Sequence, residues 1–315
     1  MRAGFASVVG RPNVGKSTLV NRMVGTKVSI VSSRPNTTRH AVRGIVHRPG
    51  AQVVLVDTPG FHRPRTVLGE RLVRAADASL GDVDVAVAVL DATAEVGAGD
   101  RMVLARAIAA VHDGDDLIGT ERPADLLVAL DKVDHARPTG LLVALNKVDR
   151  ARPVEVLARL AAAAAAVAEL GDGVQAEYFP VSALTGEGVE GLLDAVVERL
   201  PEGPAYYPEE TVTDAPEALW VAELVREQLL RRAREELPHS IACRVTEWEW
   251  PRIRCDIVVE RDSQKGIVIG RGGEVLKEVG TAVRAQLPPG AYLELHVRVE
   301  KHWQQRPDAL DRLGY

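Results

Sequence analysis

One nine-residue segment constrains the fold of this 315-residue chain more than any other. Residues 10–18 are GRPNVGKST, between an apolar run at Phe5–Val9 and a stretch of helical periodicity at Lys16–Val24. The pattern G-x-x-x-x-G-K-[ST] in this setting is typical of a loop whose backbone amides surround a phosphate group. It predicts a strand, an anion-binding loop and a helix in succession, as at the start of an α/β fold with a mostly parallel sheet.

The rest of the first 200 residues continues this alternation. Valine- and leucine-rich runs without polar alternation are expected of strands that are covered on both faces. We predict such strands at Phe5–Val9, Val53–Val56, Val83–Leu90, Leu141–Leu145 and Tyr178–Val181. Helices are predicted at Lys16–Val24, Arg65–Ala78, Asp100–Val111, Pro153–Leu170 and Val189–Leu200.

The pattern changes after residue 200. Residues 201–216 contain four prolines and little periodicity, which predicts a linker. Beyond it the expected order is α-β-β-α-α-β, with a glycine-rich turn at Gly270–Gly273 between the second and third helices. We therefore predict a first domain at 1–200, a linker at 201–216 and a smaller α+β domain at 217–315.

Composition excludes several classes of protein. The net charge of −5 rules out a histone-like basic protein, although it permits a local nucleic-acid site. Two cysteines, Cys243 and Cys255, cannot build a disulfide framework in this chain and fit a reducing compartment. We find neither a signal-peptide pattern nor an apolar run of membrane-spanning length, so we expect a cytoplasmic protein without a transmembrane segment.

Two motifs predict how a nucleoside triphosphate and Mg²⁺ are held. Lys16 would reach the β- and γ-phosphates, and Ser17 would place its hydroxyl on Mg²⁺. Residues 57–60 are DTPG, directly after a strand, so Asp57 would contact Mg²⁺ through water and the Gly60 amide would sense the γ-phosphate. The other phosphate-loop residues expected to bind the nucleotide are Gly10, Asn13, Val14, Gly15 and Thr18.

A third motif predicts selection of guanine. Residues 146–149 are NKVD, after the strand at Leu141–Leu145. Asp149 can accept two hydrogen bonds from guanine, and adenine lacks that pair of donors. Lys147 can lay its stem over the base, and Asn146 can tie the base pocket to the phosphate loop. The amides of Ser182, Ala183 and Leu184 would close the pocket.

A local duplication leaves two candidates for the guanine motif. LLVALDKVDHARPTG at 126–140 is followed at once by LLVALNKVDRARPVE at 141–155. We favour the second copy, because asparagine fits the first position and residues 150–181 have room for one helix and one strand. The alternative is Asp131–Asp134, in which case the strand assignment after Leu126 would be off by one element.

These motifs, in this order, resemble the TRAFAC class of GTPases, and three further segments resemble the Era family of bacterial ribosome-assembly GTPases. The segments are RPNTTRH at 34–40, DTPGFH at 57–62 and SLGDVD at 79–84. The resemblance implies a P-loop GTPase domain that converts GTP to GDP and phosphate. It also implies that Thr38, rather than Thr37, ligates Mg²⁺, and it makes Lys16, Thr38 and Gly60 the catalytic residues.

Position 61 bears on the mechanism. Many small GTPases have a glutamine after D-x-x-G that orients the attacking water, whereas Phe61 cannot hydrogen-bond to water. We weigh two roles for Asn13 in this light. It could help to bind K⁺, which would supply positive charge near the bridge between the β- and γ-phosphates, or it could only cap the loop.

Residues 265–280, KGIVIGRGGEVLKEVG, resemble the G-x-x-G segment of a type II KH domain, which clamps about four nucleotides of single-stranded nucleic acid. The resemblance covers nearly the whole chain. It implies RNA contacts by a basic and glycine-rich set, namely Lys265, Gly270, Arg271, Gly272, Gly273 and Lys277.

The implied function is a GTP- and GDP-binding switch that binds small-subunit ribosomal RNA and assists assembly of the small ribosomal subunit. The resemblance also implies peripheral association with the inner face of the cell membrane. We further expect a monomer. Two alternatives remain, a nucleotide-gated RNA-binding scaffold with negligible hydrolysis and a GTPase of the tRNA-modification type. The KH segment argues against the latter.

Overall fold

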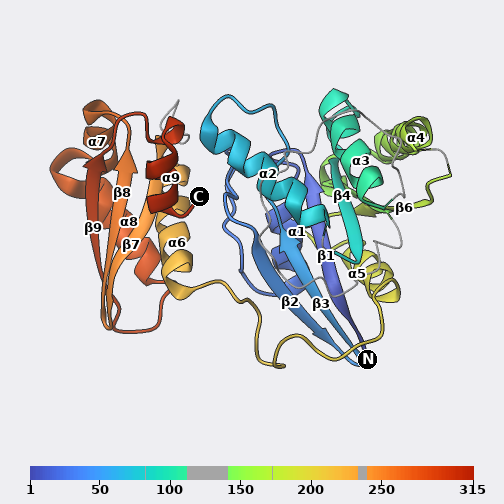
Figure 1. Ribbon diagram of the computed structural model, residues 1–315, viewed down its shortest axis with the longest axis horizontal. Helices are drawn as coiled ribbons and strands as arrows, with labels where there is room; N and C mark the ends of the chain where they lie inside the picture. The colour runs from blue at the N-terminus through green and yellow to red at the C-terminus, as the bar shows by residue number, and fades with distance from the viewer. Residues whose placement is uncertain (82, 112–140, 172, 233–239) are drawn as a thin grey trace.

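The computed structural model describes residues 1–81, 83–111, 141–171, 173–232 and 240–315. They form two α/β units that lie side by side and are joined by an extended segment (Figure 1). The phosphate-loop segment belongs to the larger, N-terminal unit, and the G-x-x-G segment belongs to the C-terminal unit.

The N-terminal unit is built on a six-stranded sheet with the order β2-β3-β1-β4-β5-β6. All neighbouring strands are parallel except β2, which is antiparallel to β3. The sequence did not predict β2, because Arg43, His47 and Arg48 interrupt its apolar pattern. The strands are β1 (Arg2–Gly10), β2 (Val42–Arg48), β3 (Ala51–Asp57), β4 (Val85–Asp91), β5 (Leu141–Asn146) and β6 (Ala176–Val181).

Helices cover both faces of this sheet, as the continuous apolar strands predict. One core lies between the sheet and helices α1 and α5, and the other lies between the sheet and helices α2, α3 and α4. The helices are α1 (Lys16–Val24), α2 (Val67–Gly81), α3 (Ala98–Val111), α4 (Pro153–Leu170) and α5 (Val189–Glu198). None of the helices in the described ranges is long and apolar enough to span a membrane.

The second copy of the duplicated segment supplies strand β5. Leu141–Asn146 pairs with β4 on one side and with β6 on the other, with Asn146 opposite Asp91. All six residues of β5 are buried. The first copy, 126–140, lies outside the described residues.

The C-terminal unit has the predicted order α-β-β-α-α-β. Strand β8 pairs antiparallel with β7 and parallel with β9. A short helix, α9, follows β9 and was not predicted. The elements are α6 (Glu217–Arg232), β7 (Ala242–Glu249), β8 (Arg252–Val259), α7 (Asp262–Ile269), α8 (Glu274–Arg284), β9 (Tyr292–Val299) and α9 (Pro307–Leu313).

The two units share an apolar contact. Leu68 and Leu72 of α2 pack in one cluster with Trp303, Leu310 and other residues of the C-terminal unit. Helices α6 and α9 lie on the side of that unit that faces the N-terminal unit (Figure 1). The C-terminal unit therefore packs on the N-terminal unit at the helix that follows the DTPG turn.

The segment 201–216 lies along the edge of the large sheet. The Ile45 amide of β2 donates to the Val212 carbonyl at 2.9 Å, and Gly44 pairs with Thr213 in an isolated bridge. Gln52 of β3 is 1% exposed and makes three bonds to the segment. Its Oε1 accepts from the amides of Tyr206 (2.7 Å) and Tyr207 (3.0 Å), and its Nε2 donates to the Tyr207 carbonyl at 2.7 Å.

We predict that Gln52→Ala lowers the free energy of unfolding by about 1–3 kcal/mol, because it leaves the backbone groups of Tyr206 and Tyr207 without their buried partner. Urea denaturation measures the change. Gln175→Ala is the control, since Gln175 is exposed, and it should change stability by less than about 0.5 kcal/mol. Equal losses in the two variants would contradict this account of how the segment is held.

Candidate nucleotide-binding site and RNA-binding loop

The phosphate loop joins β1 to α1 and needs glycine at residue 15. Gly15 has a φ of +98°, a left-handed conformation that favours glycine. A Cβ atom there would also lie 2.4 Å from Nδ2 of Asn146. The turn sets the start of α1 at Lys16, so the unpaired amides of the helix N-terminus are available to an anion.

A cavity of about 410 Å³ lies beside this loop. Its size is suited to a small-molecule ligand, since such sites usually occupy about 300–1,000 Å³. Among the residues predicted to bind the nucleotide or Mg²⁺, the lining contains Asn13, Gly15, Lys16, Ser17, Thr18, Thr38, Gly60 and Lys147. The others lie outside the lining, namely Gly10, Val14, Asp57, Asn146, Asp149, Ser182, Ala183 and Leu184.

Lys16 is a buried cation at the floor of the site. Its Nζ donates to the carbonyls of Gly10 (3.2 Å) and Arg11 (3.0 Å). Burial lowers the pKa of Lys16 to about 8, and the nearby Asp57 carboxylate acts in the opposite direction. Because neutral carbonyls replace water only in part, negative phosphate oxygens would be strong additional partners for this ammonium group.

Three oxygen-bearing side chains meet next to Lys16. The hydroxyl oxygens of Ser17 and Thr38 lie 2.8 Å apart, and Thr38 Oγ1 donates to Asp57 Oδ2 at 3.4 Å. Asp57 is fully buried, and its Oδ1 has no hydrogen-bond partner among the described residues. Burial raises the pKa of this carboxyl, whereas Lys16 lowers it.

This arrangement fits Mg²⁺. The donors are all oxygens, which Mg²⁺ prefers, and the unpartnered Asp57 oxygen is available to a water of the hydrated ion. Thr37 is engaged elsewhere, since its Oγ1 donates to the Arg34 carbonyl at 2.7 Å. The geometry therefore favours Thr38 over Thr37 as the ligand.

Asn146 connects the base-reading motif to the phosphate loop. Its Nδ2 donates to the Val14 carbonyl at 2.9 Å, the contact that the sequence suggests. Its Oδ1 accepts from the amides of Lys147 (2.8 Å) and Ala183 (2.9 Å). The Ala183 amide is thus used to hold Asn146, while Leu184 is 67% exposed.

Side-chain contacts also hold the other residues of the NKVD motif. Lys147 Nζ donates to the Asn13 carbonyl at 2.8 Å and to Asp91 Oδ2 at 2.5 Å. Ser182 Oγ donates to Asp149 Oδ1 at 2.6 Å, which fixes the orientation of that carboxylate. Asp91 was not predicted from the sequence, although its place at the end of β4 parallels that of Asp57 at the end of β3.

Phe61 points away from the site. Its side chain is 1% exposed and belongs to the core shared with α2 and α3, with the Arg106 guanidinium 4.7 Å from the ring centre. Its amide donates to the Gly10 carbonyl at 3.1 Å. The His62 ring lies against the nearby backbone, with Nδ1 2.9 Å from the Gly60 carbonyl oxygen. Neither side chain lines the cavity.

In the C-terminal unit, the G-x-x-G segment forms an open turn between α7 and α8. Gly272 has a φ of +61°, and a Cβ atom there would meet nothing within 4 Å. Arg271 and Lys277 are exposed, and Lys265 is half-buried. The structure adds Ile267 of α7, an apolar side chain that is 59% exposed near this turn and that sequence periodicity alone did not single out.

Two protein-family models match the chain. The 50S ribosome-binding GTPase model matches residues 5–118, and the KH domain model matches residues 236–304. Together with the phosphate loop, the DTPG and NKVD motifs and the G-x-x-G turn, they define a P-loop GTPase with a C-terminal KH domain.

Full-length relatives narrow the class further. The chain is 44% identical over 325 residues to GTPase Era of Mycobacterium avium, an alignment that covers 100% of this chain and 99% of the relative. The chain therefore belongs to the Era family of GTPases.

Two solved structures agree with this. A single-residue variant of Aquifex aeolicus Era bound to GDP·AlF₄⁻ matches with a TM-score of 0.84 and 34% identity. Era in complex with MgGDPNP and nucleotides 1506–1542 of 16S ribosomal RNA matches with a TM-score of 0.85 and 35% identity. Each alignment covers 100% of this chain and 99% of the other.

We predict that Asp149→Asn weakens GDP binding roughly 10- to 100-fold, because a carboxylate that accepts two hydrogen bonds becomes an amide. The same change should improve binding of xanthosine diphosphate, whose carbonyl can accept from that amide. Titration with fluorescent diphosphates of both bases measures the change. Asp134→Asn, in the first copy of the duplication, should leave guanine preference intact, and the reverse pattern would contradict the assignment.

Proposed function

We propose that this chain is a GTP-hydrolysing switch that binds small-subunit ribosomal RNA through its KH domain and assists assembly of the small ribosomal subunit. The observation that carries the proposal is the meeting of Ser17, Thr38 and Asp57 beside the buried Lys16, at the wall of a nucleotide-sized cavity. The related Era structure with MgGDPNP and a 16S fragment supports both ligand classes.

In this proposal, the residues stabilise charge during phosphoryl transfer. Lys16 places a desolvated ammonium against the β- and γ-phosphates, and the Gly60 amide faces the γ-phosphate. Ser17 and Thr38 would hold Mg²⁺ directly and Asp57 would hold it through water, and the bound ion neutralises developing phosphate charge. Gly60 has no room for a side chain, because a Cβ atom would lie 2.7 Å from the Pro12 nitrogen. The turn that positions its amide is therefore packed directly on the phosphate loop.

We further propose that K⁺ supplies positive charge near the bridge between the β- and γ-phosphates, in a site where Phe61 cannot orient the attacking water. Asn13 and Ser33 both line the cavity, and Asn13 Nδ2 donates to the Ser33 carbonyl at 3.0 Å. Because cations bind oxygen atoms, Asn13 Oδ1 rather than Nδ2 would contact a monovalent cation at the edge of the phosphate site. The proposal extends the role for Asn13 that the sequence left open.

The expected result is GTP turnover about tenfold faster in KCl than in NaCl at equal ionic strength, since a preorganised charge at the transition state is worth at least this much. Asn13→Ala should remove most of the difference. GDP affinity in the two salts serves as the control and should agree within about twofold. Equal turnover in both salts would exclude the K⁺ site.

RNA binding by the G-x-x-G turn is tested by Gly272→Asp, which places a negative charge where RNA phosphates would approach. Binding of the 16S fragment 1506–1542 should weaken about tenfold or more by fluorescence anisotropy, while GDP affinity persists. Gly290→Asp is a matched control, because Gly290 also has a positive φ (+95°) and open space around its Cβ position. Unchanged RNA affinity in a folded Gly272→Asp protein would refute RNA binding by the G-x-x-G turn.

Three further expectations stay predictions. They are the domain limits at 1–200 and 217–315, a monomeric state, and peripheral association with the inner face of the cell membrane. Limited proteolysis, analytical ultracentrifugation and flotation with anionic vesicles measure them in turn.

A further inference from the structure

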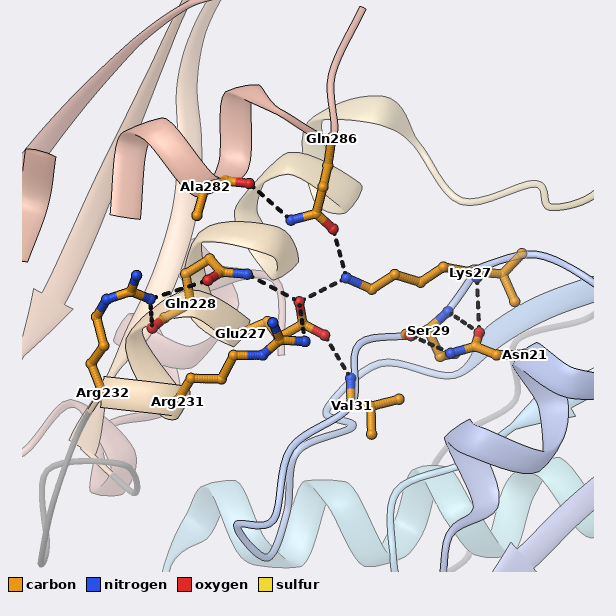
Figure 2. Close-up of polar contacts among 11 residues, drawn as sticks. Asn21, Lys27, Ser29, Val31, Glu227, Gln228, Arg231, Arg232, Ala282 and Gln286 are labelled. Atoms are coloured by element: carbon orange, nitrogen blue, oxygen red, sulfur yellow. Dashed lines mark hydrogen bonds and ion pairs between the residues drawn. The ribbon is translucent and has the colours of Figure 1, made fainter. Parts of the chain in front are cut away.

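The loop that carries Thr38, residues 25–41 between α1 and β2, is here called the switch segment. Its first part is held from within the N-terminal unit. Asn21 of α1 accepts from the amides of Val28 and Ser29, both at 2.9 Å, and donates to the Ser29 carbonyl at 2.8 Å (Figure 2). These bonds fix the start of the switch segment.

The middle of the switch segment is held by the C-terminal unit. Glu227 of α6 is completely buried, and its two carboxylate oxygens bind two different residues of the segment. Oε1 accepts from the Val31 amide at 3.0 Å, and Oε2 accepts from Lys27 Nζ at 2.7 Å. Figure 2 shows that Lys27 Nζ also donates to Gln286, just beyond the end of α8, at 2.8 Å.

Arg226, which precedes Glu227 in α6, holds the C-terminal part of the switch segment. The Arg226 guanidinium is fully buried and donates to the Thr37 carbonyl. Glu223, one helical turn earlier, fixes the guanidinium by accepting from Arg226 Nε at 2.8 Å and through a second, shorter contact. The Thr37 carbonyl belongs to the peptide group that contains the Thr38 amide, so the Arg226 bond orients the backbone that carries Thr38.

We propose that Arg226 and Glu227 are positioning residues for GTP hydrolysis. By holding residues 31 and 37 of the switch segment, they keep the Thr38 hydroxyl against Ser17. The inference rests on the role of Thr38 given under the proposed function. Ordering a loop costs conformational entropy, so a helix that pre-orders the stretch between these two residues reduces the entropic cost that binding of the nucleotide and Mg²⁺ must offset.

The two contacts are removed separately in the full-length protein. Arg226→Met combined with Glu223→Leu removes both partners of a buried ion pair, which is far less disruptive than removing one. Glu227→Gln keeps an acceptor for the Val31 amide but loses the charge that pairs with Lys27, and Glu227→Leu loses both. Glu278→Gln is the control, because it removes the ion pair between Glu278 of α8 and Arg232 of α6 and does not change a contact with the switch segment.

Four quantities are measured for each variant, namely kcat, KM, the Mg²⁺ concentration for half-maximal turnover, and the Kd for GDP. Thr38→Ala is included for comparison. We expect the Arg226→Met/Glu223→Leu and Glu227→Leu variants to lower kcat about tenfold and to require about tenfold more Mg²⁺. For Glu227→Gln, kcat and the Mg²⁺ requirement should lie between the values for these variants and for the parent. The Kd for GDP should change by less than about twofold in all of them, and Glu278→Gln should match the parent.

Two outcomes would overturn the inference while leaving the proposed function intact. One is parent-like turnover of the α6 variants at every Mg²⁺ concentration while Thr38→Ala is impaired. The other is an equal rise in the Kd for GDP and the KM for GTP, which would indicate a merely structural role. Parent-like turnover of Thr38→Ala would instead remove the assignment of Thr38, and the inference would fall with it.

Discussion

Burial of the Lys16 ammonium group beside the Asp57 carboxylate is the constraint around which the N-terminal unit is organised. Each charge is costly away from water, and each shifts the other's pKa in the direction that favours the charged form. The protein supplies part of the compensation, since two backbone carbonyls accept from Lys16 and the Thr38 hydroxyl donates to Asp57. In the proposed function, a phosphate chain and a divalent cation would supply the rest.

Contacts from distant parts of the chain hold this site in shape. Asn146 ties strand β5 to the phosphate loop, and Glu227 and Arg226 tie helix α6 to the switch segment. Helix α2, which follows the DTPG turn, is held in a similar way, since its Arg71 donates to the Tyr315 carbonyl at 2.5 Å. The C-terminal unit thus contacts two parts of the chain that adjoin the site, the switch segment and α2.

Much of this arrangement was predictable, because local patterns encode it. Helices α1 and α4 have the predicted limits, and the second duplicated copy forms β5 as favoured. Strand β2 was missed because its charged residues hide the apolar pattern. The contacts of Arg226 and Glu227 were also missed, since an arginine or glutamate on an amphipathic helix is expected to be solvated until the fold brings its partner close. Asp91 was missed because a lone aspartate at the end of an apolar strand forms no motif. Motifs specify chemistry at one place in the chain, whereas these contacts join residues up to 200 positions apart.

The backbone pairing of residues 201–216 with β1 and β2 limits how the KH domain can move. The last bridge to the sheet is at Thr213, and α6 begins at Glu217, so only three residues separate a fixed point from a rigid helix. Three extended residues span roughly 10 Å. Asp214, the first of them, is itself paired with Arg43 at 2.8 Å. The KH domain is therefore connected to the sheet by a short segment that keeps it close to the N-terminal unit. If RNA binds at the G-x-x-G turn as proposed, this segment keeps the RNA near the nucleotide site.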